Sequence, residues 1–185
     1  VVEALKVRLL EPEVFKAEVG GTTNARAYEA YLQGLYALNK GQQESTLRAA
    51  LASFDRAVAE DPGYAAAHAG RARALSQLAS NGYDPFDSGF RHAREAAQHA
   101  IELEPKLALA WLPLAYITST VDLDIPKARE QFKRAIALDP GNAEAQVVFA
   151  NFALGVGLND EAIEAASKAV QLDPIAPRPH NALAT

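Results

Sequence analysis

The chain of 185 residues contains no cysteine and no methionine. The lack of cysteine excludes a disulfide framework and thiolate chemistry, but it does not choose a cellular compartment. No apolar run approaches the ~18 residues that a membrane-spanning helix needs, and no signal-peptide pattern is present. Because translation starts with methionine and the sequence starts with Val1, we expect the chain to be a fragment of a longer protein.

Excess positive charge is also lacking, since the formal net charge is −5. Such a balance does not attract phosphate backbones or anionic lipid, so we expect neither nucleic acid nor membrane as a partner. Hydrophobic residues make up 49% of the chain, and alanine is abundant among them. Alanine has the highest helix propensity and lets helices pack closely, so the composition favours an all-α protein.

Four segments of the sequence repeat one pattern: Ala, three residues, Phe or Ala, two residues, Ala, four residues, Pro. The prolines that end them, Pro62, Pro105, Pro140 and Pro174, lie 43, 35 and 34 residues apart. A period near 34 residues is typical of stacked helical repeats, which present surfaces for binding. Each proline follows Asp or Glu and stops a helix, because proline cannot continue one.

The pattern predicts helix pairs joined by short turns. The expected helices cover residues 25–39, 47–60, 64–80, 90–104, 107–120, 126–139, 143–155 and 159–173, with a further amphipathic helix at 1–10. Thr23 or Asn24 is expected to cap the first of these pairs, and Asn159 or Asp160 the last helix. The segment 81–89 lengthens the second turn and explains the 43-residue spacing.

The four segments resemble the tetratricopeptide repeat. The third matches best, with Trp111, Leu114 and Ala115 on its first helix and Ala128, Phe132, Ala135 and Pro140 on its second. The second departs most, with His68 at the aromatic position and Arg71 at the large apolar position. The fourth has Gln146 where the aromatic is expected. The resemblance implies an all-α, right-handed superhelical solenoid of about four repeats.

The expected domains follow this register. They are an N-terminal helix and linker (1–24), a repeat array (25–174, with repeats at about 25–62, 63–105, 106–140 and 141–174), and the start of a truncated capping element (175–185). The segments from Ala27 to Tyr36 and from Asp61 to Gly70 resemble the C-terminal repeat regions of bacterial class III adenylate cyclases and winged-helix transcriptional regulators. That resemblance implies a regulatory or sensory module of a larger bacterial signalling protein, in the cytoplasm, with the periplasm as an alternative.

The family's pattern places one face of each first helix on the concave side of the solenoid, where an extended or helical peptide would bind. The expected groove residues are Tyr31, Leu35, Asn39, Arg73, Gln77, Tyr116, Ser119, Val147 and Asn151. The apolar residues among them, Tyr31 and Leu35 included, have the alternative of being inter-repeat core. Arg73 and Asn151 are the stronger candidates, because polar side chains on an inner face need a reason to be there.

The sequence gives weaker evidence for metal sites or further binding sites than for the groove. His92, Glu95, His99 and Glu102 share one helix stripe that could bind zinc, but the alanines of this helix lie on its other side, so we expect the stripe to be an exposed, wet face. His68 is expected to fill a position between helices. The segment Tyr83–Phe90 is either simply a long turn or a segment whose exposed aromatic residues bind a partner.

The sequence therefore predicts a protein- or peptide-binding scaffold, with no cofactor and no enzymatic activity. Two alternatives remain open. The chain could be a homo-oligomerisation module that uses the N-terminal helix or the open end of the solenoid, or a small-molecule sensor that uses Arg73 and the tyrosines of the groove.

Overall fold

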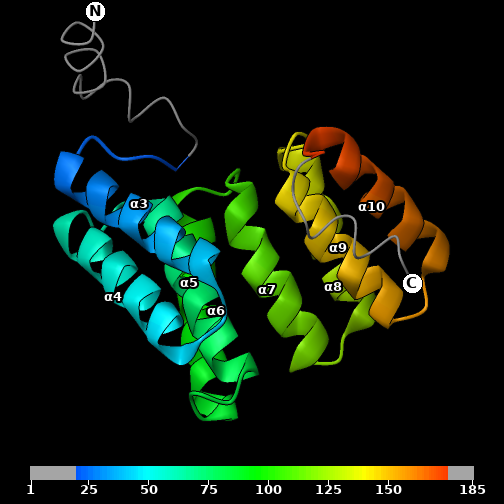
Figure 1. Ribbon diagram of the computed structural model, residues 1–185, viewed down its shortest axis with the longest axis horizontal. Helices are drawn as coiled ribbons and strands as arrows, with labels where there is room; N and C mark the ends of the chain where they lie inside the picture. Colours follow the sequence, from blue (N-terminus) through cyan, green and yellow to red (C-terminus); the bar gives the residue numbers. More distant parts are fainter. Residues whose placement is uncertain (1–19, 175–185) are drawn as a thin grey trace, which may run out of the picture. The chain divides into compact units, whose positions relative to one another are not determined.

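The computed structural model describes residues 20–174, and these residues form helices joined by turns, without a strand. The molecule divides into two compact units, one that ends at Pro113 and one that begins at Leu114. The boundary lies inside helix α7 (Ala108–Thr120), which is labelled in Figure 1. The predicted N-terminal helix and the start of the capping element lie outside the described residues.

The all-α prediction is confirmed. The helices are α3 (Ala25–Lys40), α4 (Glu44–Glu60), α5 (Ala65–Ser80), α6 (Phe86–Leu103), α7 (Ala108–Thr120), α8 (Ile125–Leu138), α9 (Ala143–Gly155) and α10 (Asn159–Leu172). Most bounds lie within a few residues of those predicted. None of the helices in residues 20–174 is long and apolar enough to cross a membrane.

The Asp/Glu-Pro steps end the second helix of every pair in the same way. The backbone N–H of Asp61 donates to Ala57 O at 3.0 Å, and that of Glu104 to Ala100 O at 3.0 Å. Asp139 and Asp173 repeat the bond, with Ala135 O and Ala169 O as acceptors. The following proline forces the capping residue into extended backbone, with φ −145° and ψ 95° at Asp61. The repeated sequence pattern is thus a repeated helix ending.

The observed N-caps agree with the predicted ones in one helix and differ in another. Asn24 caps α3 as predicted, because its side chain accepts bonds from Arg26 N and Ala27 N. The prediction for α10 is wrong: its N-cap is Leu158, which makes no side-chain bond. Asp160 lies inside the first turn, where its negative charge stabilises the helix through the macrodipole.

The segment after α5 also differs from the prediction. Only residues 81–85 form a turn, and α6 begins at Phe86 rather than near Phe90. Gly89 permits this longer helix, because a Cβ at that position would meet Ala79 Cβ at 2.8 Å. The turn is tied to α4, since Arg48 Nη2 donates to Tyr83 O at 3.0 Å and to Asp84 Oδ1 at 3.1 Å.

The core of the first unit is centred on the fully buried ring of Phe54 from α4. Two glycines line this ring, Gly34 on α3 and Gly70 on α5. A Cβ at Gly34 would lie 2.6 Å from the ring, and one at Gly70 would lie 2.5 Å from it. The ring therefore occupies space that exists only because both neighbouring helices have a glycine there.

We predict that Gly34→Ala and Gly70→Ala each lower the free energy of unfolding by ~1–3 kcal/mol, because each overpacks a filled core. Urea denaturation measures the effect. Gly155→Ala is the matched control, since a Cβ there meets nothing within 4 Å, and this variant should be neutral or slightly more stable. Unchanged stability of both core variants would contradict the packing described for Phe54.

Candidate functional site

In the first unit, the predicted groove residues divide into core and surface. Tyr31 is 7% exposed and packs against the rings of Tyr64 and Phe54, with centroid distances of 5.2 and 5.9 Å. Leu35 is half-buried against the same cluster. These two residues occupy the inter-repeat core, which was the alternative interpretation of the sequence.

The polar members of the set are more accessible. Asn39 is exposed at the end of α3, and Arg73 and Gln77 are half-buried one turn apart on α5. Helices α3 and α5 contact each other. The Gln77 Oε1 atom is buried and has no hydrogen-bond partner within the described residues.

The second unit carries the other predicted groove residues. Tyr116 and Ser119 are half-buried on α7, where Ser119 Oγ donates to Tyr116 O at 2.8 Å. On α9, Val147 is 7% exposed and offers little surface, whereas Asn151 is exposed. Each unit thus keeps accessible polar side chains from the predicted set on its first helices.

His68 fills an inter-helix position, as predicted. Its Nε2 lies 2.9 Å from Pro62 O, and its ring meets the His99 ring edge-on at 4.6 Å. Trp111 makes the same type of bond, because its Nε1 donates to Pro105 O at 3.2 Å. His68 and Trp111 therefore have the same structural role: each binds the carbonyl of the proline that ends the preceding repeat.

The His92, Glu95, His99 and Glu102 side chains are exposed, which confirms the predicted wet face of α6. His99 Nδ1 lies 3.4 Å from Glu102 Oε2, and Glu95 pairs with Arg91. Within residues 20–174, no group of three or more His, Asp or Glu side chains is arranged to hold a metal ion.

The departure from the repeat pattern at Arg71 has a physical explanation. Arg71 Nε pairs with Asp55 Oδ1 at 2.6 Å, so an ion pair links α4 and α5. In the second unit the aligned residue is Phe149 of α9, which fits the pattern. Its ring packs with the rings of Phe132 and Phe152, at centroid distances of 6.1 and 6.2 Å.

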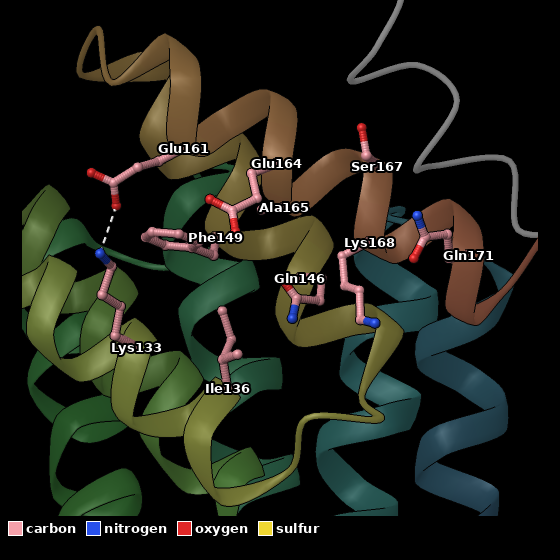
Figure 2. A pocket seen from close by; sticks show the side chains of 10 residues that line it. All are labelled: Lys133, Ile136, Gln146, Phe149, Glu161, Glu164, Ala165, Ser167, Lys168 and Gln171. Carbon is pink, nitrogen blue, oxygen red and sulfur yellow. Dashed lines mark ion pairs between the residues drawn. The ribbon is translucent and has the colours of Figure 1, made fainter.

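A cleft of about 570 Å³ opens beside this aromatic cluster, between α8 and α10 with α9 as its floor (Figure 2). Its lining includes Lys133 and Ile136 of α8, Gln146 and Phe149 of α9, and Glu164 and Lys168 of α10. At about 100° per residue, Gln146 and Phe149 lie on a different face of α9 from Val147 and Asn151. We call this space the outer cleft. It is separate from the predicted groove.

Charges at one end of the outer cleft are already matched. Glu161 accepts bonds from Arg129 Nε and Nη2, and Lys133 Nζ lies 2.9 Å from its Oε2. The Arg129 bonds, followed by Lys133, lower the pKa of Glu161, so it stays ionised. Lys133 also lies 6.0 Å from the centroid of the Phe149 ring.

The sequence interpretation missed the outer cleft. The available signal was Gln146, which stands at the position of His68 and Trp111 but is not aromatic. The sequence shows this substitution, but it does not show that the space would stay open, because that depends on how far apart α8 and α10 lie.

Burial lowers the pKa of His68 from its usual 6.5, more strongly than the bond to Pro62 raises it. As pH falls below about 6.5, the unfolded chain takes up a proton that the folded chain resists, so stability should decrease. We predict that thermal unfolding between pH 7.5 and 5 shows this decrease, and that His68→Gln reduces it. An unchanged pH dependence in His68→Gln would contradict the assignment.

No protein-family model and no curated protein sequence matches this chain. Among solved structures, it is similar to TTC0263, a thermophilic TPR protein of Thermus thermophilus. The two are 21% identical, with a TM-score of 0.70 over 87% of this chain and 83% of that one. It is also similar to the TPR domain of Arabidopsis OM64, at 18% identity and a TM-score of 0.53 over 69% of this chain and 93% of that one.

A third similar structure is the first TPR domain of Spaghetti (RPAP3), which is bound to an HSP90 peptide. It is 16% identical, with a TM-score of 0.55 over 72% of this chain and 98% of that one. At these identities the likeness shows the fold. Together with the four repeated helix endings, it establishes that the chain has the tetratricopeptide-repeat fold.

Proposed function

We propose that this chain is a protein- or peptide-binding scaffold. Its fold is built from repeated helix pairs, and such arrays serve binding through the side chains that their helices present. The TPR domain of RPAP3, which has a similar fold, is bound to a peptide. The observation that carries the proposal for this chain is the accessible polar set on α3 and α5.

That set suits an extended peptide backbone. Arg73 supplies donors, and Gln77, one turn further along α5, adds a half-buried amide group. Asn39 adds a donor and an acceptor on the neighbouring helix. A peptide that runs across α3 and α5 would contact these side chains, while Tyr31 and Leu35 keep the helices beneath it in place. Tyr116, Ser119 and Asn151 of the second unit are proposed for the same role there.

We further propose that the scaffold serves as a regulatory or sensory module of a larger bacterial signalling protein in the cytoplasm. This rests on the resemblance of residues 27–36 and 61–70 to repeat regions of adenylate cyclases and transcriptional regulators. Catalysis is not proposed, because the sequence contains no nucleophile motif, phosphate loop or zinc spacing.

A phage-displayed random-peptide library selected on the full chain tests the binding proposal. Peptides that the chain enriches should bind Arg73→Ala and Gln77→Ala at least about tenfold more weakly, measured by fluorescence polarisation, since each loses a hydrogen bond to the ligand. Arg134→Ala, which removes an exposed cation from α8, is the control and should bind normally. Equal affinity across the three variants would contradict the proposed site.

A further inference from the structure

The outer cleft is open in the second unit because a contact between two side chains of the first unit is not repeated there. The alanine-proline register aligns His99 of α6 with Lys168 of α10, and His68 with Gln146. The two histidine rings contact each other, with their centroids 4.6 Å apart. Gln146 and Lys168 instead line open space (Figure 2). The same structural position is thus filled in one unit and vacant in the other.

Two opposite charges on α10 face this space without partners. Glu164 and Lys168 lie one helical turn apart on the lining of the cleft, and neither forms a hydrogen bond or ion pair with the described residues. Glu161 is not equivalent to them, because Arg129 and Lys133 already bind it. The cleft therefore presents an unmatched anion and an unmatched cation beside the apolar side chain of Ile136.

The start of α6 in the first unit carries a matching set. Phe86 is 49% exposed, although its ring packs edge-on against the buried Phe90 at 4.8 Å. Asp87 is exposed beside it and has no partner among residues 20–174. Arg91 follows one turn later and makes only a surface pair with Glu95, at 3.3 Å. Such exposed pairs contribute little and exchange readily.

Hydrogen bonds tie the turn that precedes this tip to α4. Arg48 bonds to Tyr83 O and Asp84 Oδ1 in the turn that precedes α6, and it also pairs with Glu44. A preorganised tip loses little conformational entropy on binding. Phe86 is therefore an exposed aromatic side chain next to a turn that is tied to α4, an arrangement that suits a contact with another molecule.

The charges on the tip of α6 have the same spacing as those in the outer cleft. Asp87 and Arg91 are separated by one turn, as are Glu164 and Lys168. Two antiparallel helices would place Asp87 opposite Lys168 and Arg91 opposite Glu164, with Phe86 directed toward Ile136. We propose that the tip of α6 in one copy of this chain docks into the outer cleft of a second copy.

Such a contact joins two different surfaces, so it is heterologous, and copies can add head to tail. It uses one aromatic side chain and two exposed ion pairs. Association is therefore weak, is favoured at high protein concentration, and decreases as salt screens the charges. It does not depend on Arg73 or Gln77, so failure of the peptide-binding proposal would leave it standing.

Light scattering of the full chain over a concentration series, from about 10 μM to about 1 mM, tests the proposal; this range covers weak association. The mean mass should rise with concentration and fall on adding salt. Asp87→Lys and Lys168→Glu should each weaken association at least about tenfold, because each places like charges together. Glu130→Lys, which makes the same charge change on the exposed face of α8, should have no effect.

Restored association separates docking from misfolding. The double variant Asp87→Lys with Lys168→Glu should associate like the original chain, and so should an equal mixture of the two single variants, because both provide complementary tip and cleft pairs. A constant monomer mass across the series, association that ignores both single variants, or no recovery in the double variant and the mixture would each overturn the proposal.

Discussion

The ring of Phe54 between Gly34 and Gly70 is the contact on which the first unit depends. It lies on the second helix of one pair and touches the first helices of two pairs, so a single side chain fixes both the pair and the stacking of the next one. Because a Cβ on either glycine would overlap the ring, the distance between α3, α4 and α5 is set by the absence of two methyl groups. The accessible polar side chains of α3 and α5 owe their positions to this packing.

One scaffold position can hold very different chemistry. His68 and Trp111 both bind the carbonyl of the preceding proline and fill the space beside it, whereas Gln146 stands at the aligned position beside an open cleft. The helix endings stay the same in all four repeats, because each relies on a backbone bond and a proline. Side chains that do not take part in those endings are therefore free to differ, and the two units acquire different surfaces.

Sequence reasoning predicted the helices and their ends well, because alanine spacing and the Asp/Glu-Pro steps act locally. It placed the start of α6 too late, since the packing that allows Gly89 inside a helix involves Ala79 of another helix. It ranked Arg73 above Tyr31 as a groove residue because of polarity, but it left Tyr31 open between groove and core, because only tertiary packing decides which side chains are buried. The outer cleft could not be predicted either, because it also depends on tertiary packing, although the sequence shows the non-aromatic Gln146 at that position.

Hydrogen exchange of the full chain tests the stacked-repeat account most directly. Helix α5 contacts α3, α4 and α6, and its residues are buried on nearly every side. If stacking of helix pairs holds the first unit together, the backbone amides of Ala65–Ser80 open only when the unit unfolds, and they should exchange more slowly than those of α4 and α6. Exchange of α5 amides as fast as those of α6 would contradict the account, because it would mean that the pairs open separately.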